Sequence, residues 1–199
     1  MATSIVEIVN SALSHLGEAP ILTLNDDTVA AKESKLKWPL VRDSILREQE
    51  WGFAIDQQIL IKDVTNPPFG FDVRFQLPNE CLRVLSITEE IQPFPLGQGP
   101  TYKLVKDRYL LTNEDPDGGL PLTFISVVTD PTQYDANFVT LAALELALAM
   151  AYTLTGSNTN VDILERQAKS ARKKARSRDA KERGRHSRGS DFINTRFTT

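Results

Sequence analysis

The chain has 199 residues, which makes one domain, or one domain with an insertion, and is enough to bury a hydrophobic core. Its 41% hydrophobic and 25% charged residues are ordinary for a soluble globular protein. Its single cysteine excludes an intrachain disulfide. We expect no apolar run as long as the ~20 residues of a membrane-spanning helix. The formal net charge of −3 divides into +8 over residues 165–199 and −11 over residues 1–164. An acidic body with a basic end predicts that the end contacts something acidic, which could be nucleic acid, another protein or a neighbouring copy.

Two helices are expected at the start of the chain. Ser4 and Glu7 have the spacing of a capping box, apolar residues recur at helical intervals after them, and Gly17 is expected to end this helix in a left-handed conformation. A second helix is predicted over residues 28–50, with Pro39 inside it, where the missing N–H and the ring should kink or split the helix. Its expected apolar stripe consists of Ala30, Ala31, Leu36, Leu40, Val41, Ile45 and Leu46. The residues expected to join the core after it are Trp51, Phe53 and Ala54.

The middle of the chain, residues 55–130, contains most of the prolines and glycines, with short β-rich runs between them. Short strands separated by turns favour a small antiparallel sheet over a βαβ unit. Tight turns are predicted at 106–108 and 113–119. The candidate strands are 58–64, 71–76, 81–88, 102–105, 109–112 and 122–128.

Two further helices are expected after the β-rich region. The first, over 138–154, is apolar nearly all round, which is typical of a buried helix. The second starts at Asn160 or Asp162 and ends near Arg183 or Gly184; because it has few apolar residues, we expect neighbours to hold it in place. The predicted fold class is α+β: mainly an α-helical bundle, with an inserted small antiparallel β-sheet domain and an extended C-terminal arm. The corresponding boundaries are 1–54 and 131–186 for the bundle helices, 55–130 for the β-rich insertion and 187–199 for the arm.

The sequence contains no catalytic or metal-binding signature that we can identify. The phosphate loop, the dinucleotide fingerprint and the nucleophile elbow of the hydrolases are all missing. His15, Cys81 and His186 are far apart and lack the spacing of a zinc site. We therefore predict no catalytic residue, no cofactor and no metal, and we expect Cys81 to be a buried strand cysteine.

The basic run in the last predicted helix could neutralise several phosphates and bind nucleic acid in a salt-dependent way. It lacks interleaved aromatic residues, so stacking on bases is not indicated. A protein partner is the preferred interpretation, and nucleic acid and plain solvation are the alternatives. The residues expected to form a basic face toward another subunit or partner are Lys169, Arg172, Lys173, Arg176 and Arg178.

Several segments, taken in order, carry a resemblance to a known family. These are 12–21, 38–47 followed by 51–54, 75–85, 124–131, the helix rich in Leu and Ala, and the basic last helix. Over roughly residues 4–185 this ordered set resembles the phage head-to-tail adaptor family, which includes the podovirus tail tubular protein A.

The resemblance implies a structural virion protein and not an enzyme. Members form a ring, typically of twelve copies, that lies beneath the portal protein and joins it to the tail nozzle protein. Genomic DNA passes through the lumen during ejection without sequence-specific binding, so the implied location is the head-to-tail interface of the virion, after assembly in the host cytoplasm and without a membrane partner.

The resemblance also implies that the C-terminal segment grips the portal. In this sequence the residues expected to do so are Arg185, Arg188, Asp191, Phe192, Ile193, Arg196 and Phe197. The alternative function is a small DNA-binding protein that acts through the basic C-terminal helix.

Overall fold

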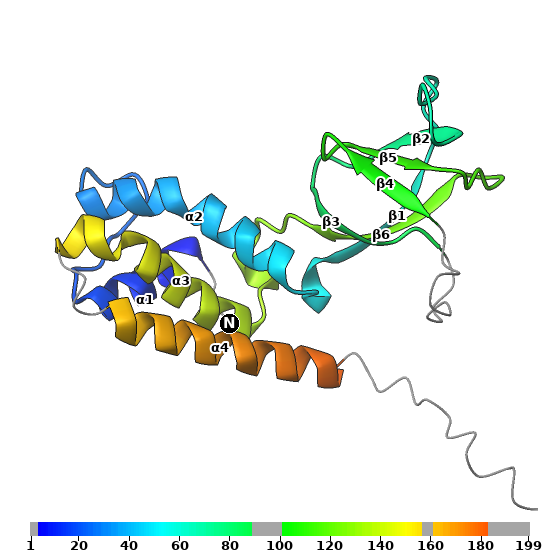
Figure 1. Cartoon of the computed structure of the whole chain (residues 1–199). Helices are drawn as coiled ribbons and strands as arrows, with labels where there is room; N and C mark the ends of the chain where they lie inside the picture. The colour runs from blue at the N-terminus through cyan, green and yellow to red at the C-terminus, as the bar shows by residue number, and fades with distance from the viewer. Residues whose placement is uncertain (1–3, 89–100, 157–160, 183–199) are drawn as a thin grey trace, which may run out of the picture.

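The structure is a computed structural model that describes residues 4–88, 101–156 and 161–182. Within these residues, four helices form a bundle and six short strands form a β region at one end of it (Figure 1). The predicted α+β fold, rich in helix with inserted antiparallel strands, is confirmed. The predicted arm lies outside the described residues, and the division into domains at residues 54, 130 and 186 stays a prediction.

Helix α1 (Ile5–Leu16) begins and ends where its capping residues predict. The Ser4 hydroxyl accepts a hydrogen bond from the Glu7 amide at 3.2 Å, which satisfies one of the unpaired donors of the first turn. Gly17 closes the helix at φ +75°, a conformation that glycine adopts without strain. Both caps agree with the prediction from the sequence.

Helix α2 (Val29–Glu48) begins after Thr28, whose hydroxyl accepts from the Ala31 amide at 3.1 Å. The prediction at Pro39 was a kink or a split; the helix continues through this residue, so the split is not observed, and the kink stays a prediction. Trp38, on one side of the proline, and Ile45, on the other, are both buried in the bundle core. We attribute the continuity to this packing, which keeps both halves helical although the proline removes a backbone hydrogen bond.

The predicted apolar stripe of α2 is wrong at two positions. Leu36 and Leu40 are 67% and 70% exposed, whereas Ser34 is fully buried and its hydroxyl lies 3.3 Å from the sulfur of Met150. Small residues at Ala31 and Ser34 suit the close approach of α3, which packs along this side of α2. The two leucines belong to the opposite, outward side of the helix.

Helix α3 (Ala136–Thr155) is the central helix of the bundle and packs against α1, α2 and α4. Its 20 residues are apolar enough to span a membrane by length and composition, so the expectation of no such run is wrong. Half of this apolar stretch is buried inside the structure, as in the core helix of a globular protein. The predicted buried helix is thus confirmed, with Asp135 and Gly156 as its caps.

The core of the bundle contains a cluster of aromatic side chains. Trp51 and Phe53 both pack against Phe138 with ring centroids 5.3 Å apart, and Tyr134 lies 4.7 Å from Phe138. The Tyr134 hydroxyl donates to the Val128 carbonyl at 2.8 Å, and burial raises the pKa of this tyrosine to about 12. The prediction that the residues after α2 enter the core is confirmed.

The strands form two antiparallel sheets of three strands each, where the sequence predicted one. One sheet has the order β1 (Ile55–Leu60), β6 (Leu120–Ser126) and β3 (Cys81–Ser86). The other has the order β2 (Val73–Gln76), β5 (Tyr109–Thr112) and β4 (Tyr102–Val105). A bridge between Lys62 and Phe75 connects the end of β1 to β2, so the two sheets enclose one β core.

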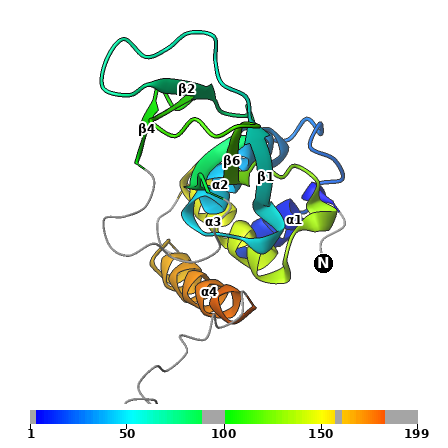
Figure 2. The same cartoon turned by 90° about the vertical axis from the view of Figure 1, so that its right-hand side faces the viewer.

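The first sheet lies nearer the helices, and β2 and β4 stand farther away (Figure 2). Strand β6 contributes to both hydrophobic cores, because successive side chains on a strand point to opposite faces. Phe124, 1% exposed, belongs to the β core together with Leu120 and Leu122. Ile125, fully buried, belongs to the bundle core together with Val128.

Both predicted turns of the β region are observed. Lys106 and Asp107, which join β4 to β5, have φ values of +55° and +51°, the left-handed pair of a tight hairpin turn. The loop 113–119 joins β5 to β6 and ends on Gly118 and Gly119, both at positive φ.

Candidate partner-binding surface

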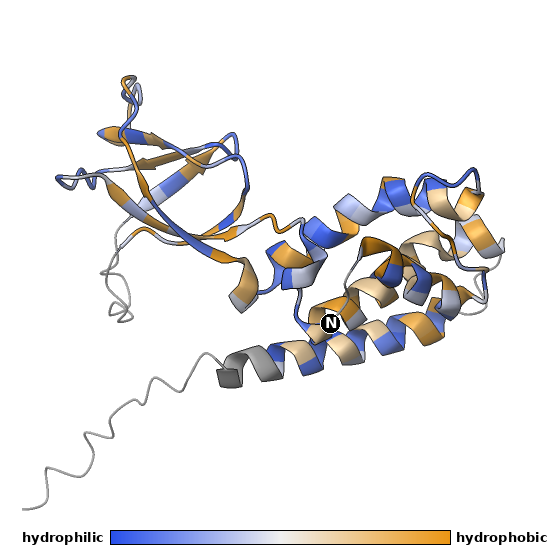
Figure 3. Ribbon diagram, turned by 180° about the vertical axis from the view of Figure 1, so that it is seen from behind, coloured by the Kyte–Doolittle hydropathy of each residue, from blue (hydrophilic) through white to orange (hydrophobic). Residues whose placement is uncertain are grey.

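Helix α4 (Val161–Glu182) carries the predicted basic face and lies along the outside of the bundle (Figure 3). It buries Leu164, Ala168 and Ala175 among the core residues of the bundle, and it packs on α3. Because these three side chains are few and mostly small, the apolar contact between α4 and the bundle is narrow. Most of the remaining surface of α4 is polar.

An ion-pair network ties α4 to the bundle. Arg172 contacts Glu145 of α3 at 2.9 Å and Glu48 of α2 at 3.4 Å, and Arg176 contacts Glu48 at 2.6 Å. Two of the residues predicted for a partner face are therefore engaged within the chain. The side chains of Glu48 and the arginines are 33–60% exposed, so each pair contributes on the order of 0.5 kcal/mol.

Glu145 is the most buried member of this network, with a side chain 16% exposed. Burial raises its pKa, and the charge of Arg172 only partly opposes this shift. The two groups are 2.9 Å apart, but their relative orientation is not that of a hydrogen bond, so we attribute their attraction to charge. The ion pair positions α4 but does not fully compensate for burying the carboxylate.

Lys169 and Lys173 occupy the outward side of α4. They are one helical turn apart, exposed, and form no ion pair with any residue that the structure describes. The side chain of Arg178 and all seven residues expected to contact the portal (Arg185, Arg188, Asp191, Phe192, Ile193, Arg196 and Phe197) lie outside the described part of the chain. The structure thus leaves two of the five residues of the predicted basic face available on one side of α4.

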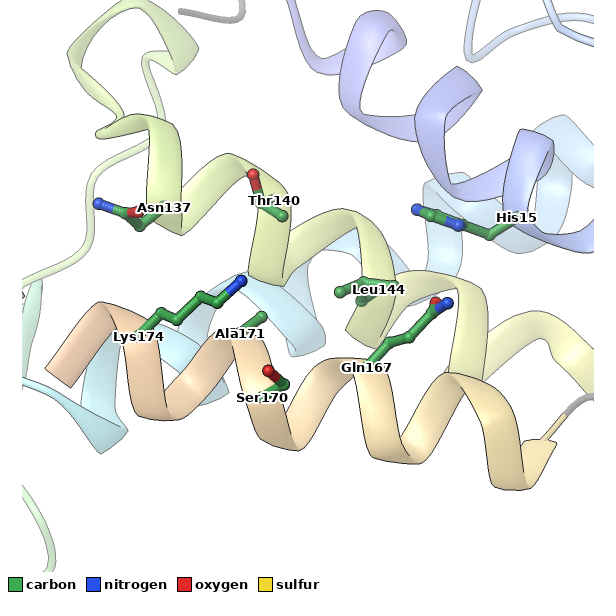
Figure 4. Close-up of a pocket in the computed structure, with 8 residues that line it drawn as sticks. All are labelled: His15, Asn137, Thr140, Leu144, Gln167, Ser170, Ala171 and Lys174. Atoms are coloured by element: carbon green, nitrogen blue, oxygen red, sulfur yellow. The ribbon is translucent and has the colours of Figure 1, made fainter. Parts of the chain in front are cut away.

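A groove of about 490 Å³ runs between α1, α3 and α4 (Figure 4). This groove is not among the sites predicted from the sequence. The only available signal was the spacing of polar residues on α4 at 167, 170 and 174, which puts them on one side of that helix. Its floor contains Leu144 and Ala171, and its polar lining residues are His15, Asn137, Thr140, Gln167, Ser170 and Lys174.

Two groups of exposed apolar side chains lie away from α4. On the outer side of α2, Val29, Leu36 and Leu40 are 62–70% exposed and are spaced for one helix face. In the β region, Val64 and Phe69 are more than 80% exposed in the segment between β1 and β2. Exposed apolar groups of this kind are typical of protein contact surfaces.

The described residues contain no group of three or more His, Cys, Asp or Glu side chains that could hold a metal ion. Cys81 is half-buried, not fully buried as predicted, because it opens the edge strand β3. Burial raises the pKa of its thiol to about 11, so the thiol stays protonated at neutral pH. The chemistry that these surfaces offer is binding by charge, hydrogen bonds and apolar contact.

Compared with known proteins, the chain has no significant match to any protein-family model or to any curated protein.

Proposed function

We propose that this chain is a structural virion protein that forms an adaptor ring between the portal and the tail nozzle of a phage. The proposal starts from the ordered motifs that resemble the head-to-tail adaptor family. The observation that carries it is that one elongated subunit has several separate surfaces suited to protein contacts: the basic outer side of α4, the outer side of α2 and the segment between β1 and β2.

A ring requires each subunit to place one surface on a different surface of the next subunit. The apolar groups on α2 and in the β region are at different places on the molecule, and each is too exposed to contribute to the subunit's own core. Their burial in an assembly would add apolar contact area at about 25 cal/mol per Å². The segregated charge, −11 over residues 1–164 and +8 over residues 165–199, gives such contacts an electrostatic preference.

Portal binding is assigned to the residues that follow α4, from Arg185 to Phe197. Since α4 is fastened to α2 and α3 through Glu48 and Glu145, it would fix the point from which this segment leaves the subunit. In this proposal the ring has about twelve copies, as in the family that the chain resembles, and DNA passes through its lumen without sequence-specific contacts.

The first experiment is mass photometry of the full chain, alone and mixed with its portal, at two salt concentrations. The expected result is a ring-sized increase in the mass of the portal. Deletion of residues 187–199 should leave the circular dichroism spectrum unchanged and weaken portal docking. Unchanged portal binding by this truncation would refute the assignment of the arm, and a portal that gains no mass from the full chain would refute the adaptor function.

DNA binding is the second candidate, and the exposed Lys169, Lys173 and Lys174 favour it. The ion pairs of Arg172 and Arg176 weaken it, because they withdraw two positive charges from the same helix. Three phosphate contacts predict a slope of about −3 in a plot of log affinity against log salt concentration. Duplex binding with this slope, lost when the three lysines are replaced by glutamine in a chain that ignores the portal, would favour this alternative.

A further inference from the structure

The groove between α1, α3 and α4 has the lining of a site for carboxylates. Lys174 supplies an ammonium group, His15 supplies an imidazole, and Gln167 and Ser170 supply further hydrogen-bond donors. These four side chains form no hydrogen bond or ion pair with the described residues, and no carboxylate is among the lining residues. A groove with hydrogen-bond donors and a positively charged side chain but no carboxylate suits an anionic group, because hydrogen bonds that involve a charged partner are stronger than those between neutral groups.

The structure also contains a loop of matching chemistry. Residues 113–119, between β5 and β6, present Glu114, Asp115 and Asp117 at exposed positions. Asp115 is paired with Lys62 at 2.6 Å, but Glu114 and Asp117 have no ion pair within the described chain. The loop has a defined shape, since the Gly119 amide donates to the Pro116 carbonyl at 3.1 Å. Its two free carboxylates therefore project from an ordered turn.

The dimensions of the loop and the groove agree. Gln167 and Lys174 are seven residues apart on α4, which corresponds to about 10 Å along the helix axis. Figure 4 shows His15 near the Gln167 end of the groove and Lys174 toward the other end. Glu114 and Asp117 are three residues apart, so their Cα atoms are separated by at most about 10 Å. One loop could therefore place a carboxylate near each end of the groove.

We propose that this groove binds the 113–119 loop of a second copy of the chain. The loop lies at the end of the β region away from the bundle (Figure 1), so the occupant comes from another subunit. The contact joins two different surfaces, as a ring requires. It rests on the proposed adaptor function and supplies one of the contacts between subunits of that ring.

Another acidic segment of the described chain fits the groove less well. In the loop before α2, the Asp26 carboxylate accepts hydrogen bonds from the Leu22 and Thr23 amides and from the Thr23 hydroxyl. Its neighbour Asp27 is paired with Lys32. Both carboxylates are already engaged within the subunit, whereas those of Glu114 and Asp117 are available.

Disulfide trapping tests the contact directly. The full chain carrying Asp117→Cys and Ser170→Cys, with the native Cys81 replaced by serine, is oxidised, free and bound to its portal, and separated by non-reducing electrophoresis. We expect a ladder of dimers, trimers and larger species, because each copy can form one disulfide through position 117 with one neighbour and a second through position 170 with the other neighbour. Each single-cysteine variant should give dimers at most. A double variant that gives no species beyond those of the single variants, in both states, would overturn the proposal.

Charge exchange tests the electrostatic part. Lys174→Glu should weaken association between copies by about tenfold or more, because it opposes like charges at the contact. Combining Lys174→Glu with Asp117→Lys should restore most of the loss. Lys173→Glu makes the same charge reversal on the adjacent, outward side of α4, which does not line the groove. Asp117→Lys should therefore not reverse any effect of Lys173→Glu. A failure of Asp117→Lys to rescue Lys174→Glu in sedimentation velocity, or an equal rescue of the Lys173 and Lys174 substitutions, would refute the proposed site.

The two proposals fail in different ways. A chain that joins the portal as a ring but gives no Asp117–Ser170 cross-link retains the adaptor function and refutes the groove contact. A chain that gives the cross-linked ladder but never binds the portal retains the contact and refutes the adaptor function.

Discussion

Replacing Gly119 by alanine should destabilise the β region more than any other glycine substitution that the structure describes. Gly119 has φ +103°, where a residue with a side chain is strained. A Cβ atom built there would lie 2.6 Å from the carbonyl oxygen of Leu60 and 2.7 Å from a methyl carbon of Ile59. Since the clash is with the backbone of β1, a rotamer change cannot relieve it. It also falls beside the Leu60–Leu120 pair at the end of the β1–β6 ladder.

The neighbouring Gly118 provides a matched control. Its φ of +97° is similar, but its added Cβ would meet no atom within 4 Å. Gly118→Ala should therefore lower the free energy of unfolding by the strain alone, about 1–3 kcal/mol. Gly119→Ala should lower it by a further 1–3 kcal/mol or so, the usual effect of forcing extra volume into packed structure.

Urea unfolding followed by far-ultraviolet circular dichroism measures this difference. Both tryptophans, Trp38 and Trp51, lie in the bundle core, so their fluorescence reports on the helices. Hydrogen exchange of the β1 and β6 amides would report on the strands. If Gly119→Ala destabilises the protein no more than Gly118→Ala does, the steric argument is refuted.

Three further predictions concern single side chains. Glu48→Ala, which removes the partner of Arg172 and Arg176, should lower the free energy of urea unfolding by about 0.5–1 kcal/mol and expose α4 to protease, and an unchanged digestion rate would contradict this. Burial raises the pKa of the Glu145 carboxyl, so the folded state binds this proton more tightly than the unfolded state does. The free energy of unfolding of the unsubstituted protein should therefore fall as pH rises above about 4.3, the ordinary pKa of glutamate. In urea titrations Glu145→Gln should be more stable than the unsubstituted protein at neutral pH and equally stable below about pH 4.3; a stability difference that grows as pH falls would contradict this prediction. With a thiol pKa of about 11, Cys81 should react with iodoacetamide at pH 8 about a hundredfold more slowly in the folded chain than in urea, and equal rates would refute its protection.

Sequence signals of local origin predicted the local structure well. The caps of α1 and the start of α2 depend on a few neighbouring residues, which the sequence displays directly. The segments 102–105 and 109–112 and the turn between them coincide with β4 and β5, because a tight hairpin is also a local structure. The all-round apolar pattern of α3 likewise predicted its central place in the bundle.

The errors occurred where a distant partner decides the outcome. Leu36 and Leu40 have helical spacing, but which side of α2 faces inward depends on the fit of Ala31 and Ser34 against α3. The predicted strand at 58–64 is shifted from β1 because its register is set by pairing with β6, about 65 residues later. The number of sheets depends on the same long-range pairing.

The candidate surfaces were predictable only in part. The basic character of α4 is evident from the sequence, but its division into an inner ion-pair network, a groove side and an outward side depends on Glu48 and Glu145 in other helices. The groove requires three helices to meet, and no spacing along one segment indicates that. The sequence alone therefore does not show that Lys174 lines the groove whereas Lys173 faces outward; the packing of α4 against the other helices decides this.

The sharing of β6 between two cores has a mechanical consequence. Rotating the β region against the bundle would have to withdraw either Phe124 from one core or Ile125 from the other, and each is at most 1% exposed. Losing a buried side chain of this size from its core costs on the order of 3 kcal/mol. A torque on the β region is therefore transmitted along β6 to the helices and is not absorbed at a flexible joint. The subunit should behave as a stiff lever, so a displacement at the tip of its strands would appear, undiminished, as a tilt of its helices.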